Sequence, residues 1–259
     1  MKIKKNKISK TQIWAHRGAS GWDTRYAPEN TMPAFEKAVQ MGADGIETDV
    51  QLTRDGFLVL AHDETIDRVS DGSGWIKDYT LKELKSFSFG KTHPEYGKVE
   101  IPELKDLLQL VKGTDLELNI ELKSGVLYYE NLEQKTADLV HSFKMDERVI
   151  YSSFSHYSVK KIMEYCKEKN YRSRFGILSG GLIGNAASYV KNLRADAYHP
   201  PVSQMQDNVI EECHALGLKV NLWTVDAKDD IKRWSNAGVD AVFTNCPDNG
   251  RVAVDSLEV

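Results

Sequence analysis

The fold is decided by residues 219–244, which read KVNLWTVDAKDDIKRWSNAGVDAVFT. The β-rich run at 219–224 predicts a strand, and residues 228–237 predict a helix that ends at Gly238. A further strand is predicted at 241–244. A strand, a helix and a second strand in this order form a βαβ unit, in which both strands lie parallel in one sheet.

The same alternation extends upstream through most of the chain. It predicts strands at 13–16, 43–50, 116–122, 149–152, 173–177 and 197–199. It predicts helices at 28–41, 102–111, 129–143, 155–169 (with Ser155 as N-cap), 182–193 and 209–216. With the two strands of the first unit this makes eight, alternating with helices. Such a series favours a closed α/β barrel, the (β/α)8 TIM barrel, over an open doubly wound sheet.

One segment interrupts the alternation. Asp55-Gly56 links the strand at 43–50 to a further strand at 57–61, and this dipeptide is typical of a hairpin, so the two strands should run antiparallel. Residues 63–101 are polar and predict only one short helix, near 81–86. They are expected to form a small inserted subdomain after the hairpin. The chain is thus predicted to be a single domain over 1–259, with its barrel at 13–62 and 102–250.

Composition excludes several classes of protein. The 259 residues carry 34 Lys+Arg and 38 Asp+Glu, a net charge of −4, which gives no basic footprint for nucleic acid. No apolar run approaches the roughly 18 residues that a membrane span needs. Residues 1–12 hold five lysines without an apolar core, so we expect a solvated arm rather than a secretory signal. Three widely spaced cysteines predict reduced thiols in a cytoplasmic protein. The oligomeric state is left open.

Two of the predicted strands carry charges where a buried parallel strand should be apolar. Glu47 and Asp49 alternate with other residues in the second strand and should point the same way. In 116–123 every even position is Leu or Ile up to residue 122, and every odd position is polar or charged. A half-exposed antiparallel strand would explain that pattern. The alternative, favoured by the βαβ context, is that Glu121 and Lys123 line the mouth of the barrel, where active sites of this fold lie.

Other strand ends add to the same rim. The first strand ends in His16-Arg17, the seventh in Trp223, and the hairpin should place His62 opposite Glu47 or Asp49. Clustered carboxylates need a cation, and oxygen ligands favour Mg²⁺ or Ca²⁺. Fixed cations suit an anionic substrate, and two histidines suit acid–base work, which together suggest phosphoester chemistry. The role of His199 is the least certain among the remaining histidines. All of them are expected to be structural or solvated: His93, His141, His156, His199 and His214.

At these residues the sequence resembles the glycerophosphodiester phosphodiesterase family. The matching blocks extend over about residues 13–250 and include AHRGAS at 15–20, APENT at 27–31, GADGIETDV at 42–50, HD at 62–63, IPEL at 101–104, NIELK at 119–123, SSF at 152–154, VNLWTV at 220–225 and TNCPD at 244–248. The combination of His-Arg, Glu-x-Asp and a later His is specific in this context.

The resemblance implies roles for individual residues. It implies a divalent ion held by Glu47, Asp49 and Glu121, and His16 and His62 as the acid–base pair. Arg17 and Lys123 would bind phosphate, and Trp223 with Phe154 would pack against glycerol. The implied reaction is hydrolysis of a small-molecule glycerophosphodiester to glycerol 3-phosphate and an alcohol, with neither nucleic acid nor membrane insertion involved.

The sequence departs from the family pattern in three places. About four extra residues around 22–25 lengthen the first loop, Asp226 stands where Asn is usual, and Asn245 stands where Asp is common. We expect these rim changes to affect substrate preference more than the reaction. Two other functions stay open: a phospholipase-like or sphingomyelinase-D-like enzyme acting on a lipid, and a catalytically inactive binding barrel.

Overall fold

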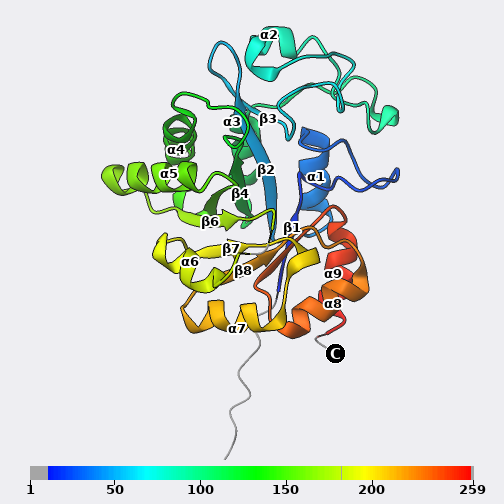
Figure 1. Cartoon of the computed structure of the whole chain (residues 1–259). Helices are drawn as coiled ribbons and strands as arrows, with labels where there is room; N and C mark the ends of the chain where they lie inside the picture. The colour runs from blue at the N-terminus through cyan, green and yellow to red at the C-terminus, as the bar shows by residue number, and fades with distance from the viewer. Residues whose placement is uncertain (1–10, 182, 258–259) are drawn as a thin grey trace, which may run out of the picture.

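The computed structural model describes residues 11–181 and 183–257, and within them the chain forms a closed barrel of parallel strands. Neighbouring strands follow the order β1-β9-β8-β7-β6-β5-β4-β2, and β1 pairs with β2 to close the ring (Figure 1). The strands are β1 (Gln12–Ala15), β2 (Gly45–Leu52), β4 (Glu117–Leu122), β5 (Val149–Ser153), β6 (Arg174–Leu178), β7 (Ala197–His199), β8 (Lys219–Leu222) and β9 (Ala241–Thr244). The predicted eight-stranded barrel is confirmed.

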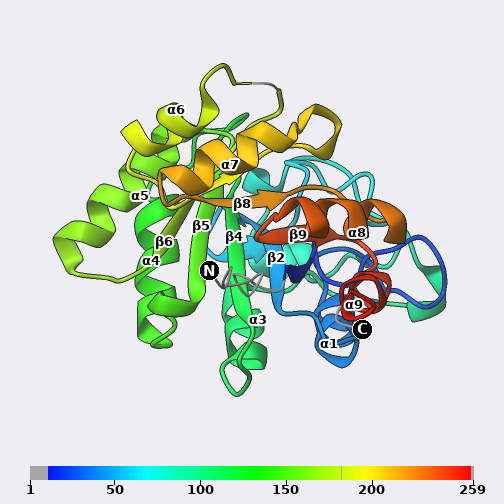
Figure 2. The ribbon, with the colours of Figure 1, turned by 90° about the horizontal axis from the view of Figure 1, so that it is seen from below.

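Helices surround the strands on the outside, as the view from below shows (Figure 2). They are α1 (Met32–Gln40), α3 (Leu104–Val111), α4 (Leu132–Ser142), α5 (His156–Lys169), α6 (Ala186–Asn192), α7 (Asp207–Ala215), α8 (Lys228–Ala237) and α9 (Pro247–Asp255). Ser155 caps α5 as predicted, since its side chain accepts a hydrogen bond from the Ser158 N–H. Helix α9 was not predicted from the sequence, although Pro247 in its first turn is a typical start signal.

The hairpin strand β3 (Leu58–Leu60) pairs antiparallel with the far end of β2, as Asp55-Gly56 predicts. The segment that follows holds the predicted short helix, α2 (Leu81–Leu84), whose Thr80 and Glu83 form a capping box. It also holds two 3₁₀ turns, at Ile76–Asp78 and Pro94–Tyr96. Figure 1 shows α2 and its flanking loops beyond the end of β2. That this chain is one domain with these boundaries stays a prediction.

Among the described residues, buried apolar side chains form three clusters. The largest lies between the strands and the surrounding helices and includes Leu118, Ile120 and Leu122 of β4. Because β4 runs parallel to β2 and β5 and is buried, the half-exposed antiparallel interpretation of this strand is wrong. A second cluster supports the insertion. The third contains Trp14, Ile150, Ala241 and Phe243, against which Trp223 packs.

Gly176 of β6 leaves room for a buried side chain of the next strand. A Cβ at this position would lie 2.4 Å from Cε1 and 2.6 Å from Nε2 of His199. Since the His199 ring is wholly buried, Gly176→Ala should lower the free energy of unfolding by about 1–3 kcal/mol, the usual cost of overpacking. Urea unfolding measures this. Gly113→Ala is the control, since a Cβ there meets no atom within 4 Å, and equal stability of both variants would contradict the packing argument.

Most of the predicted N-terminal arm, residues 1–10, lies outside the described residues. In the part of the chain that the structure describes, no helix is both long and apolar enough to span a membrane. Cys166, Cys213 and Cys246 are free thiols and are buried.

Candidate active site

Three carboxylates from two adjacent strands meet at the carboxyl end of the barrel. Glu47 and Asp49 leave the same face of β2, and Asp49 is the register partner of Glu121 on β4. One oxygen from each carboxylate lies within 4.8 Å of the other two, and all three residues are buried. We call Glu47, Asp49 and Glu121 the acidic cluster. The structure therefore brings the three predicted metal ligands together.

Burial and mutual repulsion oppose three negative charges in the acidic cluster. Desolvation raises the pKa of Glu47 well above its usual range, and the carboxylates of Asp49 and Glu121 raise it further. Desolvation and Asp49 likewise raise the pKa of Glu121 to about 7. Burial raises the pKa of Asp49 too, but His62 and the neighbouring cations outweigh it and lower that pKa. A divalent cation would supply the positive charge that three ionised carboxylates need here.

The two predicted phosphate-binding cations flank the acidic cluster. Arg17 Nε lies 3.7 Å from Asp49 Oδ2, and its Nη1 donates to Glu29 Oε1 at 3.0 Å. Lys123 Nζ lies 3.1 Å from Glu121 Oε1 and 3.8 Å from Asp49 Oδ1. Arg17 has a positive φ of 56°, and its backbone N–H donates to Glu47 Oε2 at 2.9 Å. The backbone after β1 is thereby fixed to the acidic cluster.

His16 and His62 have chemically different partners. His16 Nδ1 lies 2.7 Å from the amide oxygen Oδ1 of Asn245. His62 Nδ1 lies 2.6 Å from the carboxylate oxygen Oδ1 of Asp63. Desolvation lowers the pKa of His16 to about 4, and the Arg17 guanidinium adds to that effect. The hydrogen bond with His62 is the main reason why the pKa of Asp63 is lowered. His16 is therefore held as a neutral imidazole, while the Nδ1 of His62 has a carboxylate as its partner.

A cavity of about 140 Å³ joins these groups. Its polar wall is His16, Arg17, Glu47, His62, Asn119 and Glu121, and its apolar wall is Phe154, Leu178, Trp223 and Phe243. Phe154 and Trp223 meet edge to face with ring centroids 5.6 Å apart. Asp49 and Lys123 do not line the cavity. Each contacts a residue that does: Asp49 contacts Arg17, and Lys123 contacts Glu121. The cavity thus offers charged and acid–base groups on one side and rings on the other.

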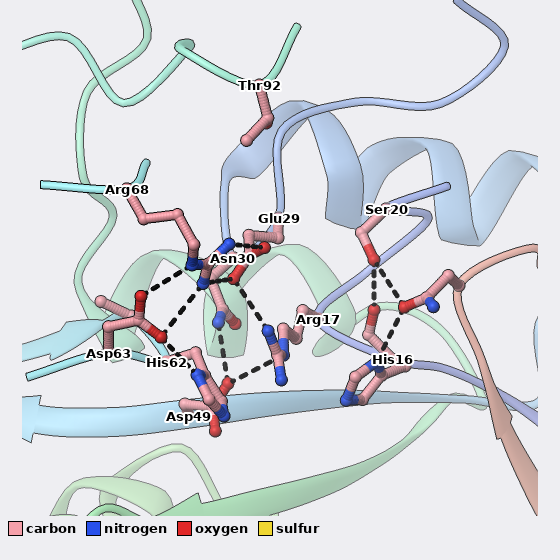
Figure 3. Close-up of polar contacts among 12 residues, drawn as sticks. His16, Arg17, Ser20, Glu29, Asn30, Asp49, His62, Asp63, Arg68 and Thr92 are labelled. Atoms are coloured by element: carbon pink, nitrogen blue, oxygen red, sulfur yellow. Dashed lines mark hydrogen bonds and ion pairs between the residues drawn. The ribbon is translucent and has the colours of Figure 1, made fainter. Parts of the chain in front are cut away.

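Polar residues without a predicted role support the acidic cluster. Asn30 has a φ of 53° and donates from Nδ2 to Asp49 Oδ2 at 2.9 Å. Arg68, from the insertion, pairs with both Glu29 and Asp63 (Figure 3). Glu29, Asn30 and Asp63 lie in sequence blocks that match the family, at 27–31 and 62–63, but no role was predicted for them. The ion pairs of Arg68 could not be predicted from the sequence, because Glu29 lies 39 positions away and becomes a neighbour only in the folded chain.

Of the three departures from the family pattern, two lie closer to the chemistry than expected. Asn245 contacts His16 directly and Asp226 contacts Asn245, so both residues lie beside a predicted acid–base residue. The cause is topological: β9 lies between β1 and β8, so the residues that follow these strands are neighbours. That they affect mainly substrate preference stays a prediction. In the lengthened first loop, Trp22 is 77% exposed and Arg25 pairs with Asp23 and Asp248.

His199 is buried inside the barrel rather than lining the cavity. Its Nε2 lies 3.0 Å from Asn221 Nδ2, and desolvation lowers its pKa to about 3. It therefore remains neutral. The other histidines expected to be structural lie outside the cavity lining, and two of them pair with carboxylates at the surface, His141 with Asp146 and His214 with Asp240.

Comparison with known proteins is consistent with this geometry. Residues 16–249 match the glycerophosphoryl diester phosphodiesterase family. A glycerophosphodiester phosphodiesterase of Caldanaerobacter subterraneus subsp. tengcongensis is 40% identical over 242 residues, covering 92% of this chain and 96% of that protein. A phosphodiesterase of Oleispira antarctica, solved with the product sn-glycerol-3-phosphate, is 28% identical, with a TM-score of 0.81 over 94% of this chain and 96% of that one.

A third relative supports the fold over the same span. A structure described as a putative glycerophosphodiester phosphodiesterase from Galdieria sulphuraria superposes with a TM-score of 0.85 at 25% identity, covering 96% of this chain and all of that one. The family match includes His16, His62, the acidic cluster and the strand ends that carry them. The resemblance seen in the sequence is thereby confirmed, and the chain belongs to the glycerophosphoryl diester phosphodiesterase family.

Proposed function

We propose that this protein hydrolyses glycerophosphodiesters to sn-glycerol 3-phosphate and an alcohol, with a divalent cation in the acidic cluster. The observation that carries the proposal is one cavity that joins two histidines, an arginine and two carboxylates of the acidic cluster. A phosphodiester anion needs positive charge at its phosphoryl oxygens, a base for the attacking hydroxyl and an acid for the leaving oxygen. Each of these groups has a candidate in this cavity.

The donor set of the acidic cluster fits a hard cation. Asp49 Oδ1 is buried and has no hydrogen-bond partner among the described residues, so a ligand oxygen is available there. Three carboxylate oxygens favour Mg²⁺ or Ca²⁺ over the softer metals. When bound, such an ion would stabilise negative charge on the phosphoryl oxygens. Arg17 and Lys123 would add fixed positive charge beside it.

The partners of the two histidines assign their roles in this proposal. Asn245 Oδ1 can only accept a hydrogen bond, so His16 carries its proton on Nδ1 and offers Nε2 as general base. The carboxylate of Asp63 holds Nδ1 of His62 and orients its ring, and we assign His62 as the general acid. His16 would take the proton of the substrate's 2-hydroxyl, whose oxygen forms the new bond to phosphorus. His62 would protonate the leaving alcohol oxygen, and water would then open the cyclic phosphate with the two roles reversed.

The apolar wall suits the glycerol end of the substrate. Phe154 and Trp223 would pack against its carbon atoms, while Trp223 is held in place by a hydrogen bond from Nε1 to the His199 carbonyl oxygen at 2.9 Å. We place the glycerophosphate group in this cavity of about 140 Å³, with the alcohol portion of the diester directed toward the rim. Contacts to the head group would therefore come from the rim loops.

A coupled assay for glycerol 3-phosphate tests the proposed function. Glycerophosphocholine and glycerophosphoethanolamine should each yield glycerol 3-phosphate with Mg²⁺ or Ca²⁺ present, and EDTA should prevent it. A lipid substrate that is cleaved while these small diesters are not would favour the phospholipase-like alternative. Absence of turnover on all of them, with either metal, would favour an inactive binding barrel.

The acidic limb of the pH profile should reflect His16. The base must be unprotonated, and the pKa of His16 is lowered to about 4, first by desolvation and then by Arg17. At saturating metal, kcat/KM should therefore stay high as the pH falls through 6.5 and decline only nearer pH 4. Repeating the profile at two metal concentrations controls for loss of metal. A decline centred on the ordinary histidine range at both concentrations would contradict the assignment of His16 as base.

A further inference from the structure

A line of hydrogen bonds crosses the ends of three adjacent strands and finishes at His16. It begins at Asp226, after β8, whose Oδ1 accepts from the backbone N–H of Asn245 at 2.7 Å and from Thr244 Oγ1 at 2.9 Å. Its Oδ2 accepts from Asn245 Nδ2 at 2.9 Å. Asn245, after β9, then places Oδ1 2.7 Å from His16 Nδ1, after β1. Asp226 thereby reaches His16 through one intervening amide.

The carboxylate of Asp226 determines the orientation of the Asn245 side-chain amide. An ionised carboxylate only accepts hydrogen bonds, so the amide must turn its NH₂ group toward Asp226 and its oxygen toward His16. Ser20 does not determine the orientation of the Asn245 amide. Its Oγ lies 2.7 Å from the His16 carbonyl oxygen and 3.1 Å from Asn245 Oδ1, and a hydroxyl could face either end of an amide (Figure 3 shows Ser20 beside His16).

We propose that Asp226 is a positioning residue that fixes the tautomer of His16 through Asn245. An amide oxygen at 2.7 Å requires a proton on His16 Nδ1, which leaves Nε2 with its lone pair in the cavity. The consequence for turnover rests on the proposed function, in which His16 is the base.

The single substitution Asp226→Asn should invert this arrangement. The introduced amide oxygen would keep the hydrogen bonds from the Asn245 backbone and Thr244, and the introduced NH₂ group would then face the NH₂ group of Asn245. Two donors in contact force the Asn245 amide to flip. The flipped amide presents a donor to His16 Nδ1, so the proton moves to Nε2 and the base is lost.

The first readout is the tautomer itself, measured without substrate. Long-range ¹H–¹⁵N correlation spectra of the Mg²⁺-loaded protein labelled in histidine, with His16 assigned by its absence in His16→Gln, should show unprotonated Nε2 in the wild type. In Asp226→Asn the unprotonated nitrogen should be Nδ1. Turnover should fall by about 10²-fold or more, the contribution of a general base, while KM changes little.

The reciprocal double substitution separates positioning from a structural role. In Asp226→Asn with Asn245→Asp, the new carboxylate at 245 accepts from His16 Nδ1 and from the new amide at 226, so every donor again meets an acceptor. This variant should restore the Nδ1–H tautomer and bring kcat to within about tenfold of the wild type, whereas Asn245→Asp alone sets two carboxylates against each other. Asp229→Asn, an exposed change nearby in α8, controls for lost charge.

The possible outcomes distinguish failure of the positioning role from failure of the proposed function. A tautomer that is unchanged in Asp226→Asn, or a double variant no better than the single one, would overturn the proposal. A tautomer switch in a protein whose wild type hydrolyses no diester would uphold the positioning role and refute the proposed function instead. Circular dichroism and thermal unfolding identify a variant that fails to fold, and the double variant then still tests the claim.

Discussion

Replacing either His16 or His62 by alanine is expected to lower kcat/KM by about 10²–10⁴-fold, the usual contribution of a general acid or base. His16 faces the cavity with its Nδ1 held by Asn245, and His62 faces it with its Nδ1 held by Asp63, so each offers its other nitrogen for proton transfer. The fold should survive, since both side chains are partly exposed at the rim. Steady-state kinetics with glycerophosphocholine measures the loss.

His214→Ala is the matched control for these two substitutions. His214, in the last turn of α7, pairs with Asp240, which directly precedes β9. This pair lies outside the lining of the cavity, so removal of His214 should leave kcat/KM within a few-fold of the wild type. The two active-site variants should also differ from each other with a substrate that carries a better leaving group, which needs less help from an acid. His62→Ala should then recover more activity than His16→Ala. Near wild-type activity in both variants would refute the two-histidine mechanism.

Removing the divalent cation should abolish turnover, and adding Mg²⁺ or Ca²⁺ should restore it. The acidic cluster places three carboxylates within 4.8 Å, and burial with mutual repulsion raises the pKa of both Glu47 and Glu121. A bound cation converts that repulsion into attraction, so metal should also raise the thermal stability of the protein. Activity before and after EDTA, and thermal unfolding with and without metal, measure both effects.

Glu121→Gln tests whether the acidic cluster is where the metal acts. It removes one ligand charge, so both the reactivation and the thermal shift should require much higher metal concentrations. Glu117→Gln on the same strand is the matched control, because Glu117 lies at the other end of β4 and pairs with Arg174. Equal metal dependence in the two variants would refute the acidic cluster as the metal site. Full activity in EDTA would refute the requirement for a metal.

Much of the barrel was predictable because its signal is local. Apolar strand runs bounded by helices predict βαβ units, and their count gave the closed barrel. The starts of several helices were less accurate, since a positive φ at a residue other than glycine leaves no periodic signal. Asn131 and Asn185 take φ values of 61° and 54° directly before α4 and α6, which therefore begin later than predicted.

The candidate site was predictable where side-chain alternation places residues, and not where contacts join distant loops. Glu47, Asp49 and Glu121 could be assigned to one face because strands alternate with a period of two. The partner of His16 could not, because Asn245 is 229 positions away and becomes a neighbour only through the pairing of β9 with β1. Asp226 is one further contact away, so its link to His16 through Asn245 could not be predicted either.

The most direct test of the central claim is ³¹P NMR of glycerophosphocholine incubated with the Mg²⁺-loaded protein. The diester resonance should be replaced by the monoester resonance of glycerol 3-phosphate as choline is released in equal amount, and EDTA should stop the conversion. A diester resonance that persists with either metal, or a cyclic phosphate that accumulates as the final product, would contradict the account.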